Sequence, residues 1–200
     1  MRKFVLSLWL ALAVLIPSYS YALDGTGTVM GPGKLEVDVT INPFESVTYG
    51  QNFAYAHYGL GNLFEVNGYV SKWGTITNWN DSTYEIYMGV MKQWATVGPL
   101  DLSTAVGLRK VLRGTDNFSL IGPGVLYAWH LSPVLRLAGH FQYIGELKNS
   151  AGLTLGALNQ GFTHEIGFYY RVAFHLELAA GIFTNSQGTP RPIYSFNFYL

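Results

Sequence analysis

Acidic, basic and imidazole side chains are the residues of this sequence that could do chemistry, and they are spread along the chain rather than gathered in one motif. They fall on the polar side of segments in which polar and apolar residues alternate. The members of this predicted charge network are Glu65, Glu85, Arg109, Arg136, His140, Glu165, Arg171 and Glu177. As structure, the acids would pair with the arginines and fill the interior of a barrel. As function, the same side chains would line a narrow pore and select solutes.

The histidines raise the question of catalysis or metal binding. His164 and Glu165 are adjacent, and barrels that modify lipids combine His, Ser and an acidic residue near the outer rim. No serine motif lies beside His164, however, and no neighbouring hydroxyl has a recognisable arrangement. His140 and His175 lie on or near the polar faces without a metal-ligand spacing. We therefore expect no enzyme activity, no metal and no cofactor, with His164 at a membrane interface.

Strands must position these side chains, and the stretch Phe162–Thr184 shows the pattern most clearly. It contains two runs of alternation joined by a very short connection. One apolar face holds Ile166, Phe168, Tyr170 and Val172, and the next holds Leu176, Leu178, Ala180 and Ile182. A period of two residues predicts strands, and each run is about as long as the roughly 9–11 residues that a tilted strand needs to cross a bilayer.

The composition also favours strands in lipid. Charged residues are 12% and aromatic residues 16% of the chain, whereas charged residues are about a quarter of a typical soluble domain. After the first segment, no apolar run approaches the roughly 18–20 residues of a spanning helix. A basic stripe that could bind nucleic acid is also missing from the sequence. A soluble sandwich or lipocalin-like barrel, with its apolar face inside, stays the alternative architecture.

The N-terminal residues predict export. Arg2 and Lys3 precede the apolar stretch Phe4–Ile16 and small residues that end at Ala22, which is typical of a secretory signal peptide over residues 1–22. A single anchor helix is the alternative. Residues 23–33 combine turn formers without a period and are expected to be a flexible periplasmic lead-in, followed by a barrel over residues 34–200.

Ten strands are predicted for the barrel. They are Lys34–Asn42, Ser46–Tyr58, Leu63–Trp73, Ser82–Trp94, Leu100–Leu112, Phe118–His130, Val134–Gly145, the two runs of Phe162–Thr184, and Arg191–Leu200. Every second connection is short, as in outer-membrane barrels with short periplasmic turns. An eight-stranded barrel is the alternative, because Gly122, Pro123 and Gly124 interrupt one strand, for which we expect a bulge.

The charges decide which face is which. An Arg or Lys at the bilayer midplane costs roughly 2–4 kcal/mol, so the charged side chains must point inward. Lys72, Lys92 and Lys110 are exceptions on the outward faces near strand ends, where a lysine can reach lipid phosphates. An interface girdle is predicted at Tyr49, Trp73, Tyr84, Trp94, Trp129 and Tyr143. In the second strand, Phe53 and Tyr55 form the aromatic, apolar face and Ala54 and Ala56 the opposite one.

On these residues the sequence resembles the small outer-membrane β-barrel proteins of bacteria. Its ending YSFNFYL is similar to their C-terminal insertion signal, with Leu200 in place of the commonest Phe. The segment HYGLGNLFEVNG, residues 57–68, is similar to segments of outer-membrane transporter families, including those associated with aromatic-compound degradation. The resemblance implies the outer membrane of a Gram-negative bacterium, contact with its lipid and lipopolysaccharide, and assembly by the insertion machinery through the last strand.

The expected function is a narrow channel or binding barrel for small solutes. A structural or surface-interaction barrel with a plugged lumen is the alternative, and a lipid-modifying enzyme is the least favoured. The sequence also predicts a register for the last full hairpin. With Val172–Ala173–Phe174 as a three-residue turn, Arg171 would lie opposite His175 and diagonal to Glu177, so that both faces agree.

Overall fold

The computed structural model describes residues 27–41, 51–73, 83–112, 118–147, 161–184, 188 and 190–199. The predicted signal peptide and the girdle residue Tyr49 lie outside these ranges. Across the described residues, no helix is long and apolar enough to cross a membrane.

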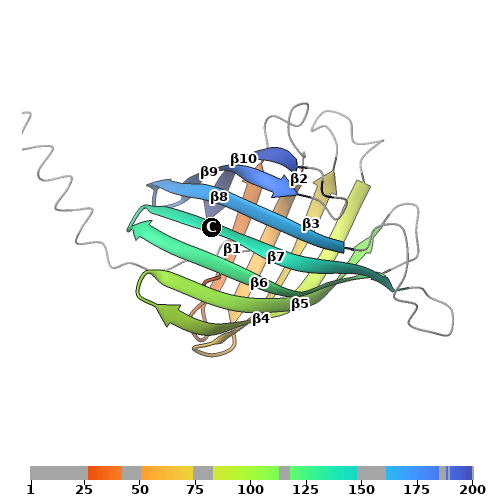
Figure 1. Ribbon diagram of the computed structural model, residues 1–200, viewed down its shortest axis with the longest axis horizontal. Helices are drawn as coiled ribbons and strands as arrows, with labels where there is room; N and C mark the ends of the chain where they lie inside the picture. The colour runs from red at the N-terminus through yellow and green to blue at the C-terminus, as the bar shows by residue number, and fades with distance from the viewer. Residues whose placement is uncertain are drawn as a thin grey trace, which may run out of the picture.

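Ten antiparallel strands form a closed barrel in which each strand pairs with its neighbours in sequence and β1 pairs with β10 (Figure 1). The strands are β1 (Leu35–Ile41), β2 (Gln51–Gly59), β3 (Phe64–Trp73), β4 (Thr83–Val97), β5 (Leu100–Val111), β6 (Phe118–Ser132), β7 (Leu135–Leu147), β8 (Gly161–Ala173), β9 (Leu176–Thr184) and β10 (Pro190–Tyr199). The predicted fold and the count of ten strands are confirmed.

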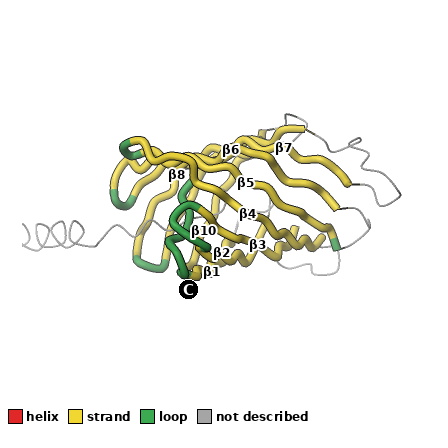
Figure 2. The backbone as a smooth tube through the Cα atoms, turned by 90° about the horizontal axis from the view of Figure 1, so that it is seen from below, coloured by secondary structure: helices red, strands yellow, loops and turns green. Residues whose placement is uncertain are grey.

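Short turns join the strands at one end of the barrel, as the alternating connection lengths predict (Figure 2). The turns between β4 and β5, β6 and β7, and β8 and β9 have two residues each, Gly98–Pro99, Pro133–Val134 and Phe174–His175. Gly98 has a positive φ of 59°, a backbone conformation that glycine adopts without a steric cost. We call this end the turn end.

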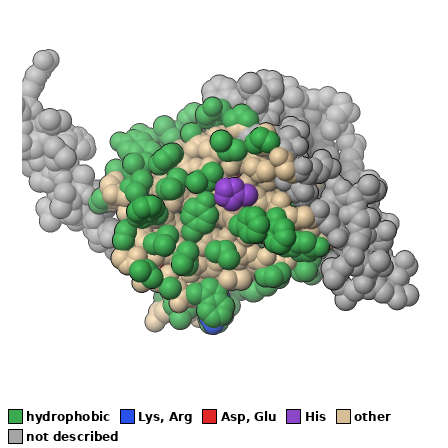
Figure 3. All heavy atoms as spheres, viewed as in Figure 1, with side chains coloured by type: hydrophobic (Ala, Val, Ile, Leu, Met, Phe, Trp, Pro, Cys, Tyr) green, Lys and Arg blue, Asp and Glu red, His purple; other side chains and the backbone are tan. Residues whose placement is uncertain are grey.

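The strands present apolar side chains outward and polar side chains to the lumen. Met88 is 69% exposed and Phe168 54%, whereas Glu65 and Asp38 on the lumen side are fully buried. Figure 3 shows one outer face, covered largely by hydrophobic side chains. Because this separation holds around the barrel, the alternative with an apolar interior is excluded by the observed faces.

The second strand faces the opposite way from the prediction. Tyr55 and His57 are buried in the lumen, and Ala54 and Ala56 are exposed outside. The Tyr55 ring lies 4.3 Å from the His57 ring and 5.6 Å from the ring of Tyr69 on β3. Aromatic size was therefore a poor guide to orientation here, because ring stacking gives tyrosines a place inside the barrel.

Two of the three lysines predicted on outward faces lie against aromatic rings, and their contact with lipid phosphates stays a prediction. Lys92 Nζ lies 4.0 Å from the centre of the Trp94 ring, and Lys110 Nζ lies 5.0 Å from the centre of the Phe118 ring. Both ammonium groups thus lie against aromatic side chains near strand ends. Lys72 differs, because it is only 8% exposed and does not extend outward to lipid phosphates.

The β8–β9 hairpin differs from the prediction in both turn and register, because Ala173 pairs with Leu176 across a two-residue turn. Arg171 lies opposite Glu177 and Tyr170 opposite Leu178, with a register shift between Arg171 and Ala173. A two-residue turn combined with a bulge replaces the predicted three-residue turn. Both faces still agree, because the bulge adds the extra residue that parity requires.

A bulge also accounts for the irregular sixth strand. The β6–β7 register shifts between Ile121 and Gly124, where Pro123 lies, and the ladder resumes on both sides of the shift. The bulge predicted for Gly122–Gly124 is confirmed, so the strand survives its proline and the eight-stranded alternative does not apply.

Candidate functional site

The N-terminal residues 27–31, which we call the lumen segment, run inside the barrel near the turn end. Thr28, Val29 and Met30 are 3%, 6% and 2% exposed. We expected residues 23–33 to be a flexible lead-in. The part of that range that is described instead packs against the strands before β1 begins.

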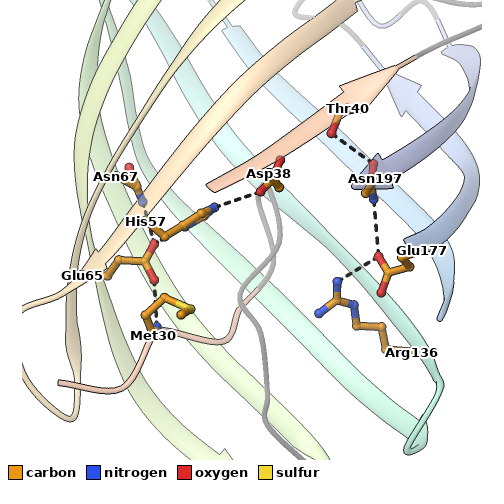
Figure 4. Close-up of polar contacts among 9 residues, drawn as sticks. All are labelled: Met30, Asp38, Thr40, His57, Glu65, Asn67, Arg136, Glu177 and Asn197. Atoms are coloured by element: carbon orange, nitrogen blue, oxygen red, sulfur yellow. Dashed lines mark hydrogen bonds and ion pairs between the residues drawn. The ribbon is translucent and has the colours of Figure 1, made fainter. Parts of the chain in front are cut away.

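Backbone and side-chain donors of the lumen segment bind acceptors on three strands. The Met30 N–H donates to Glu65 Oε2 over 2.8 Å (Figure 4), and the Val29 N–H donates to Gln93 Oε1 over 3.1 Å. The Thr28 hydroxyl donates to Asp101 Oδ2 over 2.8 Å. The segment thus satisfies two carboxylates and one amide of the lumen wall with uncharged donors.

Shape holds the segment as well. Val29 packs in a buried apolar cluster with Met91, Ala105 and Leu126. A Cβ on Gly27 would lie 2.6 Å from the Asp101 carbonyl oxygen and 2.8 Å from Tyr127 Cα, so only glycine fits this close against the wall.

Acidic side chains continue from Glu65 to β1. His57 Nδ1 lies 2.6 Å from Glu65 Oε1, and His57 Nε2 lies 3.6 Å from Asp38 Oδ2 (Figure 4). Glu36 follows at 3% exposure, and neither its oxygens nor those of Asp38 accept a hydrogen bond from a described residue. We call Glu36, Asp38, Glu65 and Asp101 the acidic strip, which spans the wall from β1 to β5.

Arg136 on β7 carries positive charge on the opposite part of the wall. Its guanidinium donates to Glu177 Oε1 over 3.1 Å, and Asn197 Nδ2 donates to the same oxygen over 3.4 Å. Asn197 in turn accepts a hydrogen bond from Thr40 over 3.1 Å (Figure 4). These bonds connect β7, β9, β10 and β1, and so span the seam where the barrel closes.

The predicted charge network forms only in part. Arg109 lies 3.7 Å from Glu85, and Arg136 pairs with Glu177 as described. Glu165 instead accepts a 2.6 Å hydrogen bond from the Tyr169 hydroxyl. Glu65 binds His57 and the lumen segment, and Arg171 lies opposite Glu177 in the β8–β9 register.

The histidines occupy several environments. His140 lies opposite Glu165 in the register, with its ring 6.3 Å from that of Phe183. His164 lies opposite Phe141 on the outer side of the barrel, with 6.4 Å between ring centres, and its place at a membrane interface stays a prediction. His175 lies in the exposed β8–β9 turn rather than on an inward face. Among the described residues, no group of three His, Asp or Glu side chains could hold a metal ion.

Thr28, His130 and Asp101 resemble a catalytic triad in composition but not in geometry. His130 Nε2 is the atom that faces both partners, at 3.4 Å from Thr28 Oγ1 and 3.1 Å from Asp101 Oδ2. A triad needs one imidazole nitrogen for the nucleophile and the other for the acid. The three residues therefore anchor the lumen segment and do not form a proton relay.

Sequence reasoning missed the lumen segment, Asp101 and the role of His57. Asp101 begins a strand whose polar face was correctly predicted at Ser103 and Arg109, so its parity could have placed it inside. His57 is polar and shares a face with Tyr55. A rule that places polar side chains in the lumen, even when a tyrosine shares their face, would have oriented β2 correctly. The lumen segment carried no periodic pattern by which it could be recognised.

Comparisons with known proteins assign the chain to no family. No protein-family model matches the chain, and no curated protein matches it. One solved structure that it resembles comes from the de novo design of transmembrane β-barrels. The two are 18% identical with a TM-score of 0.37, over 86% of this chain and 100% of the other. A likeness at this TM-score supports no conclusion about the present chain.

Proposed function

We propose that the protein is an integral β-barrel of the outer membrane of a Gram-negative bacterium, exported by a signal peptide over residues 1–22. Its lumen is closed at rest, and small solutes pass when the lumen segment leaves. The observation that carries the proposal is the lumen segment itself, which hydrogen bonds and apolar packing hold against the polar inner wall of the barrel.

Membrane location is supported by the outer surface. Large apolar side chains such as Met88, Val70 and Phe168 are 69%, 54% and 54% exposed on strands that carry buried charges on their other face. In water such a continuous apolar surface would drive association, whereas in lipid it is the required surface. Outward aromatic side chains on β10, at Tyr194, Phe196 and Phe198, suit its proposed recognition by the insertion machinery. Lipid and lipopolysaccharide would surround this belt.

The opening of the lumen can be tested at Gly59 without a change of charge. A Cβ at Gly59 would meet the Gly31 carbonyl oxygen and lie 2.7 Å from the Met30 carbonyl oxygen. Gly59→Val should therefore wedge the lumen segment off the wall. The matched control is Gly61→Val, two residues along, where nothing lies within 4 Å of the added Cβ.

Conductance in planar bilayers is the measurement. The wild-type protein and Gly61→Val should be closed for most of the time, and Gly59→Val should open far more often. Both variants must first migrate as folded barrels on unboiled gels. Cleavage of the lumen segment by added protease would show that Gly59→Val has released it. If Gly59→Val then conducts no better than wild type, solute passage is refuted.

A permanently closed barrel that acts through its outer surface is the second candidate function. It is favoured by the buried cluster of Val29, Met91, Ala105 and Leu126 and by the Arg136–Glu177 pair, because both fill the lumen with close contacts. This candidate predicts that the lumen segment stays resistant to protease in Gly59→Val. Neither candidate includes catalysis, and we propose that overexpression leaves the lipid species of the membrane unchanged by mass spectrometry.

A further inference from the structure

The charge of the lumen points to the kind of solute that an open barrel would hold. Among inward side chains whose burial the structure describes, seven carboxylates face three guanidiniums. The carboxylates are Glu36, Asp38, Glu65, Glu85, Asp101, Glu165 and Glu177, and the guanidiniums are Arg109, Arg136 and Arg171. With histidines counted as neutral, the lumen is acidic even when the buried ammonium of Lys72 is added to the three guanidiniums, and this favours cations over anions.

The excess is concentrated where the lumen segment lies. Glu85 is near Arg109, and Glu177 is paired with Arg136, so these acids are offset. In the acidic strip, Glu65 and Asp101 bind the segment and a histidine each. Arg136 and Arg171 act on Glu36, and Arg136 on Asp38, only at longer range, without a hydrogen bond to these carboxylates. Carboxyl groups exposed to water by an opened lumen ionise at neutral pH.

The lumen segment shows which donors the strip accepts. Two carboxylates, Glu65 and Asp101, receive donors from Met30 and Thr28, which are two residues apart. Two residues of extended chain span about 7 Å. The donors are an N–H and an O–H without charge, so an ammonium group at the same place would bind more strongly.

Glu36 and Asp38 supply a second, independent observation. They are 3% and 0% exposed, and their four carboxylate oxygens accept no hydrogen bond from the described residues. The histidine that lies 2.6 Å from Glu65 also lies 3.6 Å from Asp38. The carboxylates of Glu36 and Asp38, which accept no hydrogen bond from the described residues, therefore lie next to Glu65, which the lumen segment binds.

We propose that the acidic strip is a binding site for a small organic cation with two ammonium groups, a short aliphatic diamine. The diamine takes the place of the lumen segment, with one ammonium at Glu65 and the other at Asp101. The site rests on the proposed function, because the segment must leave before the diamine enters. A dianion of the same length is excluded by the charge of the strip.

Isothermal titration of the detergent-solubilised full chain tests the site, with 1,4-diaminobutane as the probe and succinate as its anionic counterpart. Gly59→Val should bind the diamine, and wild type and Gly61→Val should bind it at least about tenfold more weakly, because the segment occupies the acceptors. Adding Glu65→Gln and Asp101→Asn to Gly59→Val should weaken binding by about tenfold or more. Succinate should give no heat.

Diamine binding no tighter than that of succinate, or unaffected by the two amide substitutions, would overturn the site. Equal binding to wild type and Gly59→Val would also overturn it, since the segment would then not cover the acceptors. Because titration needs no current, the outcome is separable from solute passage. A Gly59→Val protein that binds the diamine without conducting refutes passage only, and one that conducts without binding refutes the site only.

Discussion

Arg136 is the residue on which several lumen contacts converge. Its guanidinium binds Glu177 and lies 5.2 Å from the centre of the Tyr169 ring, and both residues of the ion pair are at most 6% exposed in their side chains. A buried charge pair offsets its own desolvation only while both partners stay in place. Removing one partner should therefore cost more than the pair itself contributes.

Arg136→Ala should lower the free energy of unfolding by about 3–5 kcal/mol, because Glu177 keeps a buried charge without its main counter-ion. Urea titration in lipid vesicles measures the change. Arg109→Ala is the control, since the Arg109–Glu85 pair is longer, at 3.7 Å, and its arginine side chain is 19% exposed. That substitution should cost less, about 1–3 kcal/mol, because the longer pair is weaker although Glu85 is still left buried without it.

A second substitution separates charge from packing at Arg136. Glu177→Gln in the Arg136→Ala background removes the buried carboxylate charge that has lost Arg136, and should recover part of the lost stability. If the double variant were less stable than Arg136→Ala, the loss would come from packing against Tyr169, and the electrostatic explanation would be wrong.

Gly107 is held by close contact rather than by a turn. An added Cβ would lie 2.5 Å from the Met88 carbonyl oxygen and 2.5 Å from the Tyr87 ring. Gly107→Ala should therefore displace Tyr87 and lower the free energy of unfolding by about 1–3 kcal/mol. Gly61→Ala, which adds its methyl group to open space, should change it by less than about 0.5 kcal/mol. Similar losses from the two substitutions in the same urea titration would contradict this packing.

At the scale of the strand, the sequence predicts most of what the structure shows. Alternation places the strands because each has one face in contact with the lumen and one outside, and the bounds of β3 and β5 agree within about one residue with those predicted. Orientation follows wherever a charged side chain marks the inward face. It fails in β2, where Tyr55 and His57 share the lumen face and no Arg, Lys, Asp or Glu lies in the strand.

Two features were beyond such patterns. The β8–β9 register depends on whether a three-residue turn or a two-residue turn with a bulge forms, and both satisfy the parity of the faces. The lumen segment has only two large apolar residues, Val29 and Met30, and its packing depends on strands far along the chain, such as β4 and β6. Local sequence does not encode contacts with residues roughly 60–100 positions away.

Engineered cysteines can verify the β8–β9 register, because the chain has no cysteine of its own. Tyr170→Cys with Leu178→Cys places the two thiols directly opposite each other on the outer face and should form a disulfide under mild oxidation. Tyr170→Cys with Leu176→Cys is the matched control, because these two residues would lie opposite each other in the register predicted with a three-residue turn. In the observed register these two residues are diagonal, about 7–8 Å apart, and should cross-link poorly. If the Tyr170–Leu176 pair gave the higher yield of disulfide on non-reducing gels, the register predicted from the sequence would be correct instead.

At the scale of the whole molecule, the barrel has its polar groups inside and its apolar groups outside. The polar interior is held by the lumen segment, by the tyrosines of β2 to β4, and by the bonds from Arg136 to Thr40 across the closing seam. An apolar outer surface of this kind favours association in water and is the surface that lipid requires. The proposed place of the barrel in a membrane therefore predicts a cost for outward charges that depends on depth.

Met88 and Val97 lie on the outer side of the same strand, β4, at 69% and 64% exposure. Met88 lies along the barrel wall between Gly68 and Leu108, and Val97 is adjacent to the β4–β5 turn. In a bilayer, Met88→Arg should lower the free energy of unfolding in vesicles by about 2–4 kcal/mol, and Val97→Arg by about 0–1 kcal/mol. The folded fraction on unboiled gels over a urea series measures both. In water both arginines would be solvated, so equal, small effects would indicate that the apolar belt does not face lipid.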